Sequence, residues 1–270
     1  MRYCAKIQYI GKNYAGSQKQ PDEPTIQGEL EKAISTLINT NIKTVFSGRT
    51  DAGVNAIGQV FHMDTVQPIL ISPANIGAND EKKEDIVASN FLDSLNEILP
   101  DDISVSDLKE VPASFHAQKS AKSKHYQYEL LNEESETNKN AKFLFASERI
   151  QNVEDITGAD VDLERMQTAL NYIKGEHDFT SFKNAGTLNP SKVCFIEHAA
   201  ISKNGDKVVV DIIGNRFLYK MIRTIVGTLL EIERRKLPPE HMKSVLEAKD
   251  RTKAGKTVSP YGLTLIKVIY

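Results

Sequence analysis

The chain has 270 residues, of which 40% are hydrophobic and 26% charged, and its formal net charge at pH 7 is −2. These values are typical of a soluble globular protein that buries a substantial core, in one large domain or two modest ones. No apolar run approaches the length of a membrane span and no signal peptide is visible, so we expect a cytoplasmic protein. Cys4 and Cys194 have no metal-ligand spacing and are expected to be buried free thiols.

The first part of the chain predicts strands and helices in mixed order. Alternating apolar and polar residues predict strands over 3–10, 42–47, 58–64 and 103–111. Apolar residues at helical spacing predict helices over 26–38 and 91–99. Boundary residues support both helices, because Pro24-Thr25 precedes the first and Pro100 ends the second.

The second part has a similar composition. It predicts strands over 124–131, 193–202, 206–213 and 262–270, and helices over 163–173, 216–235 and after Pro238-Pro239. Tyr126, Tyr128 and Leu130 fall on one face of the first of these strands. Asn204-Gly205 predicts a hairpin turn, and the polar region 131–160 is expected to be rich in loops.

This order of elements predicts an α+β protein made of two mixed α/β subdomains with largely antiparallel sheets. We place an N-terminal subdomain at residues 1–105 and a C-terminal subdomain at residues 106–270. No internal repeat is strong enough to show that one half duplicates the other.

One segment has an unusual concentration of small residues around a charged pair. It reads Gly48-Arg49-Thr50-Asp51-Ala52-Gly53-Val54-Asn55-Ala56. Glycines on both sides permit tight turns and close approach of a ligand, so the pattern predicts a carboxylate and a guanidinium presented on a turn. The alternative is a surface turn with a weak ion pair, and the local pattern does not decide between the two.

Arg223 lies in the most apolar helix that the sequence predicts. Burying an arginine costs free energy unless a carboxylate pairs with it, so one interpretation pairs Arg223 with Asp51. In the alternative, the helix is amphipathic and the guanidinium extends to water. Tyr126, judged by its own surroundings, is an ordinary strand aromatic.

Basic residues are grouped although the whole chain is nearly neutral. The runs are Lys119, Lys122 and Lys124, then Arg216, Lys220 and Arg223, and finally Lys253 and Lys256. Such grouping permits a basic cleft for nucleic acid, although each run alone is typical of a solvated face.

Several segments match one family in combination. They are GRTDAGV at 48–54 followed by Gly58-Gln59-Val60, LNEILPDDI at 95–103, FHA at 115–117, KHYQY at 124–128, DFTSF at 178–182, MIRTIVGTL at 221–229, DRTKAGKT at 250–257 and GLTL at 262–265. The combination is specific and covers nearly the whole chain. It resembles the TruA-type tRNA pseudouridine synthases.

The resemblance implies a fold and a set of site residues. The fold is the pseudouridine synthase fold, with a continuous central sheet, helices on its outer faces and an active-site cleft between the halves. Asp51 is the implied catalytic carboxylate, Arg223 its partner and Tyr126 the residue that contacts the target base. Leu263 is implied to pack against the base from the other side, and Arg49 to help extrude or replace it.

The resemblance also implies a reaction and its partners. A homodimer isomerises uridine to pseudouridine in the anticodon stem-loop of tRNA, at positions 38–40. The base must leave its stack, and basic contacts to the RNA must offset that cost. Because no redox change or phosphoryl transfer occurs, no cofactor and no metal are expected.

The chain departs from the family pattern at two positions, where Ser17 replaces a usual Trp and Asn55 a usual His. These leave open which uridines and which tRNAs are modified, and keep a non-catalytic tRNA-binding paralogue as the alternative. A glycosidase or nucleosidase is disfavoured because no second carboxylate has a motif around it. Residues 254–257 resemble the end of a phosphate-binding loop, but its first glycine is missing, so we reject a nucleotide site.

Overall fold

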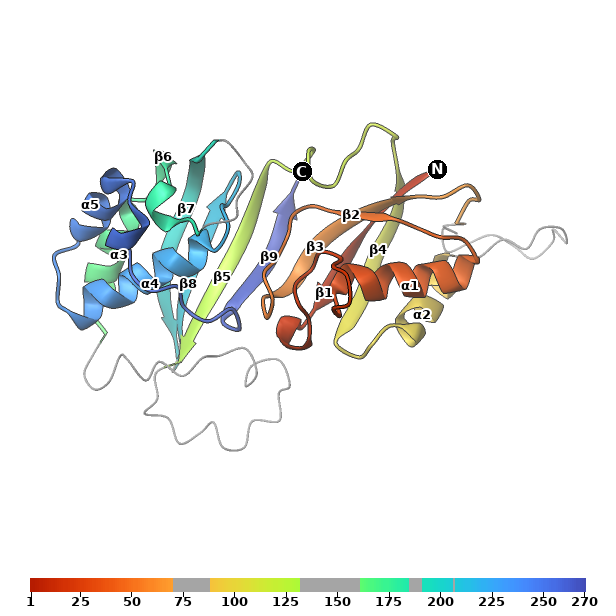
Figure 1. Ribbon diagram of the computed structural model, residues 1–270, viewed down its shortest axis with the longest axis horizontal. Coiled ribbons are helices and arrows are strands. Elements are labelled where there is room, and N and C mark those ends of the chain that lie inside the picture. Colours follow the sequence, from red (N-terminus) through yellow and green to blue (C-terminus); the bar gives the residue numbers. More distant parts are fainter. Residues whose placement is uncertain (70–87, 132–160, 185–190, 206) are drawn as a thin grey trace, which may run out of the picture. The chain divides into compact units, whose positions relative to one another are not determined.

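The computed structural model describes residues 1–69, 88–131, 161–184, 191–205 and 207–270. This described part is a mixed α/β protein with antiparallel strand pairs and five α-helices, which confirms the predicted class (Figure 1). It divides into two compact units, Met1–Ala121 together with Tyr270, and Lys122–Ile269. Among the described residues, no helix has the length and apolarity needed to cross a membrane.

The boundary between the units lies later than the sequence suggested. A division at 105/106 would cut strand β4 (Ile103–Val111), which pairs with β1 (Arg2–Tyr9) from Ile103 to Val111. Backbone pairing therefore assigns the whole of β4 to the first unit, and that unit extends to Ala121.

In the first unit, β1 lies between β4 and β3 (Asn55–Asp64), and the short β2 (Thr44–Phe46) pairs with β3. Helices α1 (Ile26–Ile38) and α2 (Ala88–Ile98) contact each other, and α2 packs on β4 (Figure 1). Helix α1 begins as predicted, because the Thr25 hydroxyl accepts a hydrogen bond from the Gly28 amide at 3.2 Å. The largest fully buried side chains of this unit include Tyr3, Tyr9, Phe61 and Phe91.

In the second unit, the strands lie in the order β9, β5, β8, β7, β6, with antiparallel neighbours (Figure 1). Their bounds are β5 Ser123–Leu131, β6 Gly175–Asp178, β7 Val193–Asn204, β8 Lys207–Gly214 and β9 Leu263–Ile269. The helices are α3 Leu163–Asn171, α4 Met221–Arg234 and α5 His241–Ala248, with short 3-10 turns at Thr180–Phe182 and Arg251–Lys253. A further 3-10 turn, Gly11–Asn13, belongs to the first unit. Helices α3, α4 and α5 contact one another, and α3 packs on β7.

Strand β5 confirms the predicted alternation. Tyr126, Tyr128 and Leu130 are all buried on one face. On the opposite face, the side chains of His125 and Gln127 both hydrogen-bond Asp211 Oδ1, at 2.7 and 3.2 Å. Strand β5 therefore separates an apolar face from a polar one, as the sequence pattern required.

Some predicted bounds are wrong, and the reasons are local. Helix α4 begins at Met221 rather than at 216, because Lys220 has φ of 60° and interrupts the helical backbone. Strand β3 begins at Asn55, three residues before the predicted 58, and β6 was not predicted. Nearly all of the polar region 131–160 lies outside the described residues.

Both cysteines are buried free thiols, as predicted. Burial raises the pKa of Cys4, and raises that of Cys194 to about 11. Neither thiol is therefore poised to act as a thiolate at neutral pH.

Candidate active site

The charged segment forms a loop of residues 47–54 between β2 and β3, here called the Asp51 loop. Gly53 has φ of 80°, a left-handed backbone that favours glycine, and the Val54 amide donates to the Asp51 carbonyl at 3.1 Å. Asp51 is half-buried and Arg49 is exposed. The loop thus presents a carboxylate and a guanidinium on a tight turn, as the sequence predicted.

Thr50, next to Asp51 in the chain, is fixed through both its backbone and its side chain. Its amide donates to Ser17 Oγ at 2.8 Å, and its carbonyl accepts from the Ser17 amide at 3.2 Å. Its hydroxyl lies 2.9 Å from the Tyr9 hydroxyl. All three residues are buried, so these bonds are made away from water.

Gln59 fixes the start of the same loop. Its Oε1 accepts from the Ser47 hydroxyl at 2.5 Å, and its Nε2 donates to the Gly48 carbonyl at 2.9 Å. The Ser47 amide donates to the Val60 carbonyl at 2.8 Å. Gln59 is fully buried, and its side-chain amide bonds the Gly48 carbonyl in the way that the backbone of a paired strand would.

The segment 10–17 packs directly against the Asp51 loop. The Gly11 amide donates to Asn55 Oδ1 at 2.9 Å, and a Cβ on Gly11 would lie 2.2 Å from the Val54 carbonyl oxygen. Gly16 has φ of 114°, and a Cβ there would lie 3.0 Å from the Thr50 carbonyl oxygen. Of the two departures from the family pattern, Ser17 therefore bonds the loop itself, and Asn55 bonds Gly11 in the segment that packs against the loop.

Asp102 supports segment 10–17 from its other side. Its carboxylate accepts a short hydrogen bond from the Tyr14 hydroxyl and a second one, at 3.2 Å, from Asn13 Nδ2. Its carbonyl accepts from the Ile10 amide at 3.0 Å. The segment LNEILPDDI, which has no evident catalytic group, thus contributes to the shape of the Asp51 loop through segment 10–17.

In the second unit, Arg223 lies in the first turn of α4 and is only 9% exposed. Its Nε donates to the Val258 carbonyl at 2.8 Å, and its carbonyl accepts from the Val258 amide at 3.3 Å. The interpretation in which Arg223 extends to water is therefore wrong. The segment 254–258 lies along α4, where a Cβ on Gly227 would lie 1.7 Å from the Lys256 carbonyl oxygen.

Tyr126 is 7% exposed, and its ring meets that of Phe217 edge-on, with centroids 5.2 Å apart and an interplanar angle of 81°. It pairs with Leu265 across β5 and β9, whereas Leu263 pairs with Tyr128. The Tyr128 hydroxyl donates to the Ser259 carbonyl at 2.9 Å. Burial raises the pKa of Tyr128, and the positive charge of nearby Arg223 partly offsets this rise.

The predicted site residues are thus divided between the two units. Asp51 and Arg49 belong to the first unit, and Tyr126, Arg223 and Leu263 to the second, where Tyr128 lies near both Arg223 and Leu263. Sequence reasoning missed Tyr9, Thr50 and Gln59 as the support of Asp51. Gln59 had a weak signal in the Gly58-Gln59-Val60 segment, while Tyr9 had none, because it looks like any core strand residue.

The remaining motifs of the second unit are structural. Asp178 Oδ1 accepts from the amide and the hydroxyl of Thr180, at 2.9 and 2.6 Å, and so opens a 3-10 turn. Arg251 donates to the carbonyls of Ala254 and Gly255 at 3.3 and 3.1 Å. A Cβ on Gly255 would lie 2.5 Å from the Gly227 carbonyl oxygen, so this glycine packs against a helix rather than leaving room for a phosphate.

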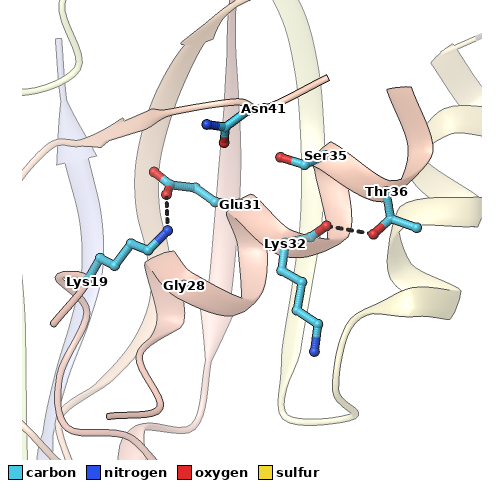
Figure 2. Close-up of a pocket in the computed structure, with 7 residues that line it drawn as sticks. All are labelled: Lys19, Gly28, Glu31, Lys32, Ser35, Thr36 and Asn41. Atoms are coloured by element: carbon cyan, nitrogen blue, oxygen red, sulfur yellow. Dashed lines mark hydrogen bonds and ion pairs between the residues drawn. The ribbon is translucent and has the colours of Figure 1, made fainter. Parts of the chain in front are cut away.

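A hollow of about 340 Å³ lies beside α1 in the first unit. It is lined by Lys19, Gly28, Glu31, Lys32, Ser35, Thr36 and Asn41 (Figure 2). Lys19 Nζ is 3.2 Å from Glu31 Oε2, and Glu31 Oε1 also accepts from the Thr44 amide at 2.8 Å. None of these residues belongs to the Asp51 loop, so the hollow is not the candidate active site.

The comparison with known families agrees with this geometry. The family model described as tRNA pseudouridine synthase matches residues 5–118 and 169–270, which include Asp51, Arg223 and Leu263. The chain belongs to this family. It is an isomerase that acts on uridine in tRNA.

Individual relatives extend the match to the whole chain. A protein of Anoxybacillus flavithermus is 40% identical over all of this chain and 98% of its own length. A protein of Brevibacillus brevis is 38% identical over 98% of this chain and 97% of its own length. A third, from Colwellia psychrerythraea, is 37% identical over all of this chain and 94% of its own length. All three are named tRNA pseudouridine synthase A.

Proposed function

We propose that Asp51 is the carboxylate that isomerises a uridine of the tRNA anticodon stem-loop to pseudouridine. The observation that carries this proposal is the Asp51 loop, in which the neighbouring backbone is fixed by buried hydrogen bonds while Asp51 itself remains half-exposed. A carboxylate presented in this way is fixed in place but still open to a substrate.

The reaction breaks the C1′–N1 bond of uridine, rotates the detached uracil and forms a C1′–C5 bond, after which C5 loses its proton. One carboxylate is sufficient, and it has two possible routes. As a nucleophile, Asp51 attacks C1′ and forms a glycosyl ester that the uracil C5 later displaces. As a base, it removes the 2′ proton while the C1′–N1 bond breaks to give a glycal, and it returns the proton to C2′ as the C1′–C5 bond forms.

Other residues receive supporting roles. Arg223 keeps the Asp51 carboxylate ionised and oriented, Tyr126 stacks on the extruded uracil, and Leu263 packs on the opposite side of the base. Arg49, which is exposed, helps extrude the base or takes its place in the stack.

The proposal includes the target and the assembly. The substrate is tRNA with uridine at positions 38–40, modified in the cytoplasm by a homodimer. Dimer formation would widen the basic surface that a nearly neutral chain offers to RNA. Light scattering after gel filtration tests the assembly, and a strict monomer at assay concentration would count against it.

The target is tested with tRNA transcripts that carry C5-tritiated uridine. In three transcripts, only one of positions 38, 39 and 40 is uridine, and in the control all three are cytidine. We expect tritium release from at least one of the three transcripts and none from the control. Equal release from the control would contradict the anticodon stem-loop as target, and no release from any transcript would contradict the activity itself.

A further inference from the structure

Four polar side chains gather beneath the Asp51 loop. They are Tyr9, Ser17, Thr50 and Gln59, here called the polar cluster, and each is at most 8% exposed. Tyr9 is its central member, because its hydroxyl hydrogen-bonds the Thr50 hydroxyl at 2.9 Å and the side chains of Gln59 and Ser17 lie close enough to lower its pKa. Ser17 and Gln59 fix the loop backbone, at Thr50 and Gly48 respectively. The Tyr9 hydroxyl therefore lies among the side chains that hydrogen-bond the loop backbone at Gly48 and Thr50.

We propose that Tyr9 is a positioning residue for catalysis, whose hydroxyl aims Asp51 at the substrate by holding the Thr50 side chain within the polar cluster. This inference rests on the proposed function of Asp51. Tyr9 does not touch the substrate, since it is 2% exposed and lies under the loop. Its effect passes through Thr50, the residue directly before the carboxylate.

The physical argument concerns what remains when the hydroxyl is removed. A buried polar group without a partner is costly, so the remaining members would rearrange to find other partners. Because Thr50 and Gly48 carry the loop backbone, such a rearrangement shifts Asp51. A misplacement of about 1 Å of a catalytic group lowers the rate by roughly 100-fold. Burial raises the pKa of Tyr9 to about 12, so the hydroxyl remains protonated and able to donate throughout the neutral range.

The same strand supplies a matched control. Tyr3 is 1% exposed, lies on β1 like Tyr9, and its hydroxyl accepts a hydrogen bond from the Ile69 amide at 2.9 Å. The same hydroxyl donates to Met1 Sδ at 3.4 Å, and both partners lie outside the Asp51 loop. Tyr3→Phe and Tyr9→Phe therefore each remove one buried, hydrogen-bonded hydroxyl from one strand, but only Tyr9→Phe removes it from the polar cluster.

The test measures kcat, KM for tRNA and thermal stability of both variants in the full-length protein. We expect similar decreases in Tm, because the two losses are alike. For Tyr9→Phe we expect kcat to fall by about 10- to 100-fold with KM within about twofold of wild type, as removal of an interaction made for the chemical step requires. For Tyr3→Phe, kcat should stay within about twofold. Equal kcat values for the two variants would overturn the proposal.

A second pair of variants keeps the test decisive if Tyr9→Phe folds poorly. Thr50→Ser retains the hydroxyl that meets Tyr9, whereas Thr50→Val removes it at nearly the same size. We expect Thr50→Ser to retain kcat and Thr50→Val to lose it. The double variant Tyr9→Phe, Thr50→Val should lose little more than the worse single variant, because both remove the same hydrogen bond. Fully multiplicative losses would contradict the proposal.

The failure of this inference can be distinguished from failure of the proposed function. Asp51→Asn is assayed in parallel with the Tyr9 variants. If Asp51→Asn is inactive and Tyr9→Phe behaves like Tyr3→Phe, the positioning role is wrong while the catalytic carboxylate stands. If Asp51→Asn is fully active, the proposed function is wrong, whatever the Tyr9 variants show.

Discussion

The two regions that carry the candidate site residues are stabilised in different ways. The Asp51 loop has no regular secondary structure, and polar side chains bond its backbone at Gly48 and Thr50. Tyr126 lies within a strand, and Arg223 lies in the first turn of a helix, where it also bonds the Val258 backbone. Around them, apolar contacts and close glycine packing determine the geometry.

The difference predicts how each region responds to substitution. In a loop fixed by buried hydrogen bonds, removal of one polar atom frees several others, so the effect should appear in catalysis as well as stability. Where a helix packs closely on a segment, as α4 does on residues 254–258, a change in side-chain volume should mainly lower the free energy of unfolding. Four substitutions or titrations test this contrast.

The largest stability effect is expected from Gly227→Ala. The new Cβ would lie 1.7 Å from the Lys256 carbonyl oxygen, so α4 and segment 254–258 must separate. We expect a loss of at least about 3 kcal/mol in the free energy of unfolding. Gly205→Ala is the control, because it has φ of 60° but nothing within 4 Å of the new Cβ, and should cost only about 1 kcal/mol. Denaturant unfolding measures both, and equal losses would contradict tight packing at Gly227.

The next effect is a pH dependence at the base of the Asp51 loop. The pKa of Tyr9 rises from 10.0 to about 12 on folding, so the folded protein retains this proton where the unfolded chain loses it. The raised pKa of Tyr9 contributes roughly 2 to 3 kcal/mol to the free energy of unfolding. This contribution is fully present below pH 10 and is lost as the pH rises toward about 12. Tyr9→Phe should therefore show a weaker decrease of stability between these pH values than wild type. Parallel curves for the two proteins would contradict the expectation.

Ser17→Ala should reduce stability by about 1 to 2 kcal/mol, because it leaves the buried Thr50 amide without its acceptor. It should also reduce kcat more than it changes KM, because substitutions in the Asp51 loop are expected to affect catalysis as well as stability. Ser244→Ala is a suitable control, since that hydroxyl is exposed and donates only to the Glu240 carbonyl. A variant with wild-type kcat would mean that the Thr50 backbone needs no support from Ser17.

The smallest effect is expected in the second unit from Phe217→Leu. It keeps an apolar side chain but removes the edge-on contact with Tyr126, worth about 1 kcal/mol beyond burial. Because a strand already fixes the Tyr126 backbone, kcat should change by less than about threefold. A loss as large as that of Ser17→Ala would remove the contrast between the regions.

Much of the fold could be predicted because its signals are local. Helix α1 has helical spacing and a Thr25 cap, and β5 alternates half-buried and buried side chains from His125 to Leu130. Strand β6 could not be predicted, since Gly-Glu-His-Asp has no apolar alternation and becomes a strand only by pairing with β7. The start of α4 was missed because Phe217 and Leu218 extend the apolar pattern past the break at Lys220.

The candidate site shows the same limit. The Asp51 loop and Arg223 could be identified from motifs, because both combine charge with an unusual neighbourhood. The residues that fix the backbone beside Asp51 could not be identified from motifs, because Tyr9 and Ser17 lie 41 and 33 residues from Thr50 in the chain. Ser17 and Asn55 were noted only as departures from the family, whereas the structure shows both in contact with the loop or its neighbour Gly11.

The central claim, that Asp51 performs the chemistry, is tested most directly by Asp51→Asn. This substitution keeps the size of the side chain but removes its ability to act as nucleophile or base. The measurement is single-turnover tritium release from C5-labelled tRNA at saturating enzyme, with tRNA binding measured separately and Asp107→Asn, an exposed carboxylate of the same unit, as control. The account predicts retained binding and a rate lower by at least about 1000-fold. A rate within about tenfold of wild type would contradict it.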